Sequence, residues 1–169
     1  GICGVCGLSP NIDTKRELIL RMNETLVHRG PDDVGIYVNS DGRTALGHRR
    51  LSIIDLSPSG RQPMKNEDGS IFITFNGEIY NYRELRQDLI KMGHSFQSSS
   101  DNEVIIHRYE QCGIDFRHQL QGMFSLGIWD EKKKEVLLAR DRLGKKPLFY
   151  MYVNNEVVFA SEVKALLAQ

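Results

Sequence analysis

The spacing of hydrophobic residues along this chain switches repeatedly between the spacing of a strand and that of a helix. Residues 3–8 are typical of a short strand. The segment 70–75 is apolar on both faces, as in a strand of a sheet that is covered on each side. The residues on either side of 40–42 (Ser-Asp-Gly) predict a hairpin. From residue 122 onward the pattern predicts four more strands, with turns at 130–134 and 154–155.

Helical spacing dominates in the stretch after the first predicted strand. Asn11 and Thr14 provide capping side chains for a helix that carries Leu18, Met22 and Leu26 four residues apart. That helix is predicted to end in the segment "RGPDD" (29–33), because its Gly-Pro pair cannot continue a helix.

Two further helices are predicted in the middle of the chain and a short one at its end. They cover residues 81–93, where Gly93 ends the helix, and residues 101–113; the last begins near Glu162. The apolar stripes are formed by Leu85, Leu89 and Met92 in the first of these helices and by Ile105, Tyr109 and Cys112 in the second.

This order of elements predicts an α+β fold in a single domain over residues 1–169. Helices clustered in mid-chain, with strands toward both ends, favour largely antiparallel sheets. Strands that are apolar on both faces favour two sheets stacked face to face with helices outside, a four-layer α-β-β-α sandwich. No repeat or low-complexity linker divides the 169 residues, and a chain of this length can bury a sizeable core.

Composition excludes several classes of function. The 22 basic and 22 acidic side chains cancel, so no net field draws the molecule to nucleic acid or to anionic lipid. No apolar stretch is long enough to span a bilayer, and the first residues do not resemble a secretory signal. Three cysteines, an odd number, argue against a disulfide scaffold and for a reducing compartment. We therefore expect a cytoplasmic protein with neither a nucleic-acid nor a membrane partner.

Cys3 and Cys6 in the opening "GICGVCGLSP" have the C-x-x-C spacing of a redox pair or half a zinc site. A structural zinc site needs four ligands, and the remaining Cys112 and the five histidines show no matching paired spacing. A redox pair normally opens a helix, whereas Gly4, Val5 and Gly7 favour strand and tight turn. Alternatively, Cys3 is a nucleophile: if it were the first residue, its own amine, which titrates at about 8, could take the thiol proton. An apolar cysteine in an edge strand is the ordinary structural alternative.

Eight sequence motifs follow one another from end to end of the chain: "CGVCG", "HRGPDD", "GHRRLSIIDLSPSGRQPM", "FNGEIYNYRELR", "SDNEVI", "GMFSLGIWD", "LLARDRLGKKPLFY" and "FASEVKALL". In this order they closely resemble the glutamine amidotransferase domain of glutamine-hydrolysing asparagine synthetases, a class II (N-terminal nucleophile) amidotransferase. The resemblance covers essentially the whole chain. It implies the N-terminal nucleophile hydrolase version of the sandwich fold.

The resemblance also implies the chemistry and its residues. Cys3 attacks the side-chain amide of L-glutamine to form a γ-glutamyl thioester and release ammonia, and water then frees glutamate. The Asn76 side-chain amide and the Gly77 N–H form the oxyanion hole. The forked guanidinium of Arg50 holds the substrate α-carboxylate, and Asp101 pairs with its α-ammonium group.

Four more residues complete the substrate-binding set that the resemblance implies: Leu51, Ile53, Ile54 and Glu78. It implies no metal and no cofactor in this domain. The partner it implies is a C-terminal synthetase domain that uses ATP and Mg²⁺ to make asparagine from aspartate and the ammonia. The chain ends without the Gly-rich pyrophosphate loop of that domain, so we expect a domain cut from a longer protein. A homodimer is a further expected assembly.

Each site residue also has an ordinary structural alternative. Asn76-Gly77 is a common turn dipeptide, Arg50 is one charge of a solvated "HRR", and Asp101 is a helix N-cap. His48 has the residue type of a catalytic partner, but a packed strand histidine is the better interpretation. "RGPDD" and "DRLGKK" have the composition of binding loops, and we assign them no catalytic role.

Gly1 and Ile2 precede Cys3, whereas the working cysteine of the family is the first residue. Three explanations stay open: a cloning remnant, a propeptide, or a domain that has lost catalysis. Three hypotheses follow: the glutaminase part of an asparagine synthetase, the same part serving a sugar or acyl acceptor, and a non-catalytic glutamine-binding module. The zinc or redox interpretation is the weakest.

Overall fold

The computed structural model describes residues 1–7, 11–51 and 60–168. Its strands are β1 (Ile2–Gly7), β2 (Asp33–Val38), β3 (Thr44–Arg50), β4 (Met64–Lys65), β5 (Ile71–Ile79), β6 (Gly122–Asp130), β7 (Glu135–Arg140), β8 (Phe149–Val153) and β9 (Glu156–Ala160). Its helices are α1 (Ile12–Thr25), α2 (Tyr82–Lys91), α3 (Asp101–Cys112) and α4 (Val163–Leu166), with 3₁₀ turns η1 (Val27–Arg29) and η3 (Gly113–His118).

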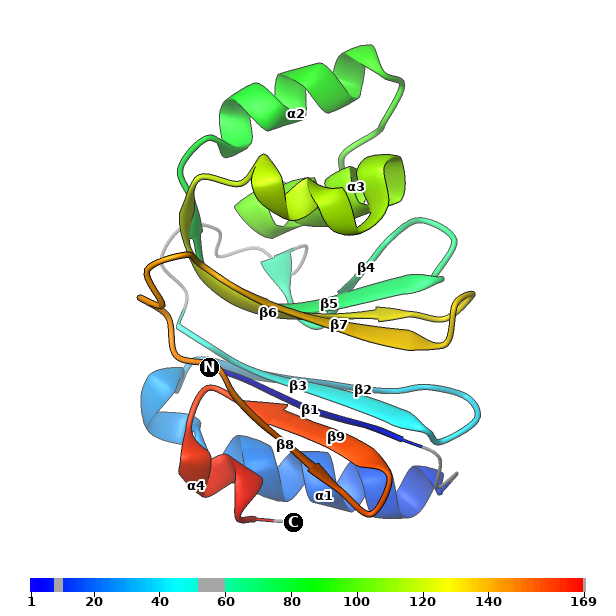
Figure 1. Cartoon of the computed structure of the whole chain (residues 1–169), viewed down its shortest axis with the longest axis vertical. Coiled ribbons are helices and arrows are strands. Elements are labelled where there is room, and N and C mark those ends of the chain that lie inside the picture. The colour runs from blue at the N-terminus through cyan, green and yellow to red at the C-terminus, as the bar shows by residue number, and fades with distance from the viewer. Residues whose placement is uncertain (8–10, 52–59, 169) are drawn as a thin grey trace.

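Two antiparallel sheets form the middle of the molecule in the described part of the chain. One sheet has the strand order β2-β3-β1-β9-β8, and the other has the order β4-β5-β6-β7. Figure 1 shows these sheets stacked between α2 and α3 on one side and α1 and α4 on the other. The predicted four-layer α-β-β-α sandwich and its α+β class are confirmed.

Strand β1 shows how alternation sorts side chains between layers. Ile2 points between the sheets, where it joins Leu46, Trp129 and Phe159 in a cluster of fully or almost fully buried side chains. Cys3, the next residue, points to the opposite face of the same sheet. This period of two is the geometry of any strand, and it decides below what Cys3 can do.

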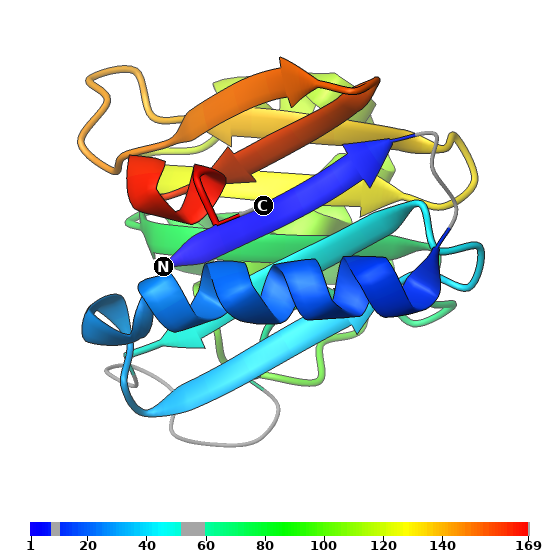
Figure 2. The same ribbon diagram turned by 90° about the horizontal axis from the view of Figure 1, so that it is seen from below.

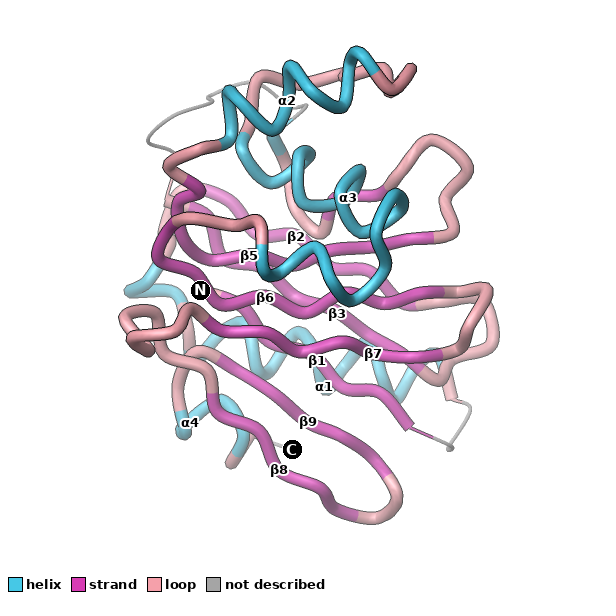
Figure 3. The backbone as a smooth tube through the Cα atoms, turned by 45° about the horizontal axis from the view of Figure 1, so that its top comes forward, coloured by secondary structure: helices cyan, strands magenta, loops and turns pink. Residues whose placement is uncertain are grey.

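The helices cover the outer faces of the two sheets. Asn11 caps α1 by accepting a hydrogen bond from the Thr14 N–H at 3.0 Å, as predicted, and Leu18 and Met22 are buried beneath the helix. Figure 2 shows α1 crossing the five-stranded sheet, with α4 beside it. Figure 3 shows α2 and α3 on the outer side of the four-stranded sheet.

The predicted elements are found, with differences. Strand β4 was not predicted, and α1 ends at Thr25, before the segment 29–33. Met92 was predicted on the apolar stripe of α2 but is 56% exposed, because that stripe ends at Leu89, which is fully buried. The strand predicted at 70–75 continues to Ile79 and so includes the dipeptide Asn76-Gly77. Among the described residues, no helix combines the length and the apolar character that a membrane crossing requires.

Candidate active site

A pocket of about 290 Å³ lies where one end of both sheets meets the start of α3. Its lining residues come from the chain start, the end of β3, the second half of β5, the first turn of α3 and the segment after β7. They are Gly1, Arg29, His48, Arg49, Arg50, Leu51, Gly60, Gln62, Phe75, Asn76, Gly77, Glu78, Ser100, Asp101, Asn102 and Lys146. Of the sequence-predicted residues, the structure therefore brings together Arg50, Leu51, Asn76, Gly77, Glu78 and Asp101.

Asn76 carries a side-chain amide whose nitrogen has no hydrogen-bond partner among the described residues. Its Nδ2 is buried and makes no hydrogen bond with any described residue. A buried N–H in this state costs about 1–3 kcal/mol, so it is rarely kept without a use. An oxygen of a bound molecule in the pocket would supply the missing acceptor.

Gly77 lets β5 pass close to β6 at the pocket wall. The two strands pair with Gly77 opposite Phe124, and a Cβ on Gly77 would lie 2.1 Å from the Met123 carbonyl oxygen. Any side chain at this position would push the strands apart. The backbone beside the Asn76 amide therefore carries no side chain and is held in place by its pairing with β6.

Asp101 opens α3 and is tied to β5. Its Oδ2 accepts a hydrogen bond from the Ile79 N–H at 2.8 Å. Burial raises the pKa of this carboxyl, against the backbone hydrogen bonds that favour its charged form, and the nearby Glu78 raises it further. A cationic group in the pocket would stabilise the charged form of Asp101.

The charges that line the pocket are of both signs. Arg29, Arg49, Arg50 and Lys146 supply the cations, and Glu78 and Asp101 supply the carboxylates. Arg49 Nε donates to the Asn23 carbonyl at 3.0 Å, and Arg29 Nη1 lies 3.1 Å from Glu162 Oε1. The arrangement can hold a small molecule that carries both a negative and a positive charge.

His48 lies beside the pocket as a packed strand histidine, as the sequence suggested. It is 6% exposed, and its Nε2 lies 3.1 Å from the Phe75 carbonyl oxygen, to which the ring donates. Burial, helped by nearby positive charge, lowers its pKa to about 3. The ring is therefore neutral at pH 7, and its Nε2 proton is engaged.

Residues 2–169 match the family model described as a glutamine amidotransferase domain. The chain belongs to the glutamine amidotransferase domain family. Two solved structures share its fold: a glutamine phosphoribosylpyrophosphate amidotransferase from B. subtilis (TM-score 0.83, 23% identity) and the allosteric regulatory enzyme of purine biosynthesis (TM-score 0.84, 24% identity). Each match covers 99% of this chain and 43% of the other.

Sequence relatives of this amidotransferase domain are more similar. Asparagine synthetases [glutamine-hydrolyzing] 2 and 1 of Bacillus subtilis are 44% and 43% identical to it, each over 99% of this chain. Asparagine synthetase [glutamine-hydrolyzing] 1 of Arabidopsis thaliana is 42% identical over 98% of it. The chain spans only 22%, 26% and 28% of the length of these three relatives.

Cys3 does not lie in the pocket of this amidotransferase domain, which corrects its predicted role. Its side chain is fully buried against α1, and its Sγ lies 3.4 Å from Asn23 Oδ1. Burial raises the pKa of the thiol to about 12, so it is protonated at neutral pH. Alternation along β1 turns Ile2 between the sheets and Cys3 to the face that α1 covers, which the motif spacing does not reveal. Gly1, which lies just before the strand, reaches the pocket.

The other two cysteines do not rescue the metal and redox interpretations. Cys6 packs with the cluster between the sheets, whereas Cys3 packs with the cluster under α1, so their thiols lie on opposite faces of β1. All three cysteines are free thiols. The C-x-x-C spacing therefore reflects a strand and not a pair of ligands.

Two predicted site residues, Ile53 and Ile54, lie outside the described residues. The structure adds pocket residues that we had not assigned, and two of them come from segments whose composition already indicated binding: Arg29 from "RGPDD" and Lys146 from "DRLGKK". Gln62 carried no such signal. Its Oε1 accepts the Phe75 N–H at 2.6 Å, a contact that depends on the fold alone.

Proposed function

We propose that this domain binds L-glutamine in the pocket and hydrolyses its side-chain amide to glutamate and ammonia through a covalent γ-glutamyl intermediate. The unpaired Asn76 amide, set in a pocket between cationic and carboxylate side chains, carries this proposal. Glutamine needs these features: a grip on its α-carboxylate, a grip on its α-ammonium group, and donors for the amide oxygen. A cavity of about 290 Å³ lies at the lower end of ligand pockets, which suits a single amino acid.

Each predicted residue takes one part of that task. Arg50 pairs with the α-carboxylate, and Asp101, with Glu78 beside it, pairs with the α-ammonium group. The Asn76 Nδ2 and the Gly77 N–H donate to the oxygen that becomes negative when the amide carbon is attacked. Removing one such donor typically costs about 3–4 kcal/mol of transition-state stabilisation.

The attacking thiol belongs at the Gly1 end of the pocket and not at Cys3. The Gly1 nitrogen lies at the pocket wall, where it donates to the Arg49 carbonyl at 2.7 Å, and the Cys3 thiol is buried and protonated. We therefore place the attacking thiol at the pocket wall beside the Gly1 nitrogen. Its thiolate attacks the amide carbon, the amide nitrogen leaves as ammonia after protonation, and water then cleaves the thioester to glutamate.

A diazoketone analogue of glutamine, which alkylates an attacking thiol, tests this assignment in the full natural protein. We expect one glutamine-protected modification, located by peptide mass spectrometry outside Cys3, and unchanged ammonia release in the Cys3→Ala variant. Labelling of Cys3, or loss of ammonia release in a folded Cys3→Ala protein, would overturn the assignment.

The burial of Cys3 favours a second candidate function, a non-catalytic glutamine-binding module. None of the three cysteines lines the pocket among the described residues, so a glutamine bound there would have none of these thiols beside its amide. Saturable glutamine binding, with neither ammonia release nor labelling in the full natural protein, would establish this second function and exclude the first.

For the whole protein we propose the synthesis of asparagine from aspartate, with the released ammonia consumed by an ATP- and Mg²⁺-dependent synthetase part. The similarity to asparagine synthetases that hydrolyse glutamine supports this proposal. A sugar or acyl acceptor is the alternative, and a product assay with aspartate and ATP distinguishes them. The free thiols support our proposal of a cytoplasmic location. The homodimer stays a prediction.

A further inference from the structure

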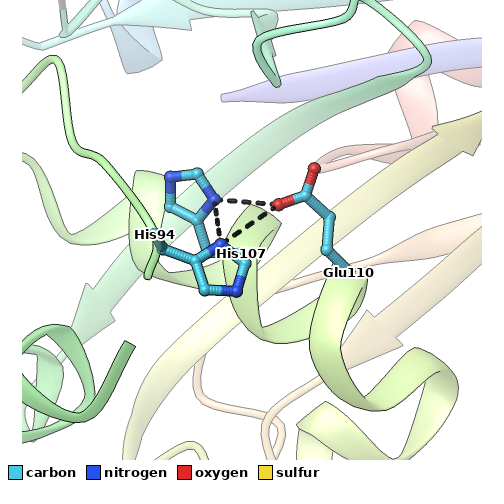
Figure 4. A group of neighbouring side chains, drawn as sticks. All are labelled: His94, His107 and Glu110. Carbon is cyan, nitrogen blue, oxygen red and sulfur yellow. Dashed lines mark hydrogen bonds and ion pairs between the residues drawn. The ribbon is translucent and has the colours of Figure 1, made fainter. Parts of the chain in front are cut away.

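A cluster of two histidines and a glutamate lies on the outer side of the four-stranded sheet, apart from the pocket. His94 follows the end of α2, and His107 and Glu110 lie three residues apart on one face of α3. Figure 4 shows the three side chains converging from these two segments. None of the three lines the pocket proposed for glutamine.

The converging atoms have the separations of ligands around one small cation. His94 Nδ1 and His107 Nδ1 are 3.2 Å apart, His107 Nδ1 and Glu110 Oε2 are 2.9 Å apart, and His94 Nδ1 and Glu110 Oε2 are 3.7 Å apart. A triangle with these sides has a point about 2 Å from every corner, which is the length of zinc–imidazole and zinc–carboxylate bonds.

Other side chains already orient two of these three groups. His94 Nε2 lies 3.2 Å from Gln111 Oε1, which accepts its proton, so that the lone pair of Nδ1 faces the cluster. Asn66 Nδ2 donates to Glu110 Oε1 at 2.8 Å, which leaves Oε2 for the cluster. Such outer hydrogen bonds fix ring tautomers and carboxylate orientation at metal centres.

His107 is the buried member, and its far nitrogen faces negative charge. The residue is 1% exposed, and its Nε2 makes no hydrogen bond with the described residues. Glu67 Oε1 and Glu103 Oε1 lie 3.7 and 3.9 Å from that nitrogen. A proton on Nε2 suits these carboxylates and leaves the Nδ1 lone pair for a cation, whereas a bare Nε2 would set a lone pair against them.

We propose that His94, His107 and Glu110 bind one divalent transition-metal ion, with zinc as the best fit. Two imidazoles and one carboxylate make a three-ligand set, and a water molecule completes the tetrahedron on the exposed side. The Glu110 and His94 side chains are 23% and 18% exposed, which gives the ion a path from solvent. Bound there, the ion ties the segment after α2 to α3, the helix that begins at Asp101.

Zn²⁺ binding to the full natural protein, stripped of metal with a chelator, tests this site. We expect a protein-to-zinc stoichiometry that falls by one in the His94→Gln and Glu110→Gln variants, or an affinity at this site at least about tenfold lower in them. His118→Gln changes an exposed histidine outside the cluster and serves as the matched control, with unchanged binding. Equal zinc stoichiometry and affinity in all four proteins would overturn the proposal.

Co²⁺ substitution provides a second measurement that does not depend on a variant that folds. The wild-type protein is expected to show the intense visible bands of four-coordinate Co²⁺, and X-ray absorption is expected to show imidazole scattering in the first shell. An octahedral spectrum without imidazole ligands would count against the site as strongly as the absence of binding.

Discussion

The pocket and the histidine cluster are both polar, but they differ in how their polar atoms are satisfied. In the pocket, Asn76 Nδ2 is buried and has no partner in the described part of the chain. In the cluster, His94, His107 and Glu110 face one another, and His94 and Glu110 are each held by a further side chain.

The pocket therefore presents an unpaired donor to a ligand oxygen, whereas the cluster presents lone pairs to a cation and is held in place by surrounding side chains. A buried unpaired donor destabilises the free protein, and a ligand oxygen removes this penalty. Replacing Asn76 should therefore alter glutamine hydrolysis more than stability. The cluster is held by surrounding side chains and lies apart from the pocket, so changing it should alter stability more than glutamine hydrolysis.

The largest expected effect comes from Asn76→Ala. We expect kcat for glutamine hydrolysis by the full natural protein to fall about 100- to 1000-fold, because one oxyanion donor is removed. The thermal midpoint should stay the same or rise slightly, since the variant no longer buries an unpaired amide. Ammonia release measures kcat, and a thermal melt measures the midpoint. An unchanged kcat would contradict the role of Asn76 as an oxyanion donor.

The converse variant is His107→Gln. We expect a loss of about 2–3 kcal/mol in the free energy of unfolding, because buried and partly buried carboxylates lose the imidazole between them. The edge contact of the ring with Phe96, with centroids 4.7 Å apart, is lost as well. Urea unfolding in the presence of a chelator measures the loss. A drop in kcat without a drop in stability would contradict the role assigned to the cluster.

A smaller effect is expected at Cys3, which is close to the pocket in sequence but not in space. Cys3→Ala should destabilise the protein by about 1 kcal/mol, since a single buried heavy atom is removed. In the intact protein an alkylating reagent should modify Cys112 before Cys3, because burial raises the pKa of Cys3 to about 12 and Cys112 is partly exposed. Mass spectrometry of partially alkylated protein gives the order, and early modification of Cys3 would contradict its burial.

The smallest effect concerns Glu162, which holds the pocket residue Arg29. Burial opposes its charged form, but hydrogen bonds from His28, Arg29 and Lys164 outweigh it and lower its pKa from 4.5 to about 2. The stability that this pairing contributes is present above pH 4.5 and is lost as the pH falls toward 2.

Glu162→Gln should therefore flatten the stability profile between pH 4.5 and 2, by less than about 1 kcal/mol because the pair lies near the surface. Unfolding curves at a series of pH values measure this difference. Equal slopes for wild type and variant would show that the pairing contributes nothing.

Much of the fold could be predicted from the sequence because its signals are local. The Asn11 cap, the buried Leu18 and Met22 of α1 and the hairpin between β2 and β3 depend on residues close together in the chain. Met92 was wrong because the end of a helical stripe depends on what the helix packs against, which is tertiary information.

The site was predicted in part, for a related reason. Asn76 and Gly77 were found through their motif, although the same dipeptide is common in turns; here it continues β5, because Gly77 lacks the Cβ that would meet Met123. Cys3 was misplaced because the motif does not state which face of β1 it takes. His94 and His107 stand 13 residues apart and meet only because the chain turns back between α2 and α3.

Strand β5 also affects how the pocket binds a ligand. Its nine residues pair with β6 from Ile71 to Ile79, so the stretch that carries Asn76 and Gly77 is continuous with the innermost layer of the protein. This wall of the pocket is already ordered in the free protein, so ligand binding there loses little conformational entropy of the protein. Amide protons on this strand should accordingly be among the slowest to exchange with solvent, whether the cavity is filled or empty.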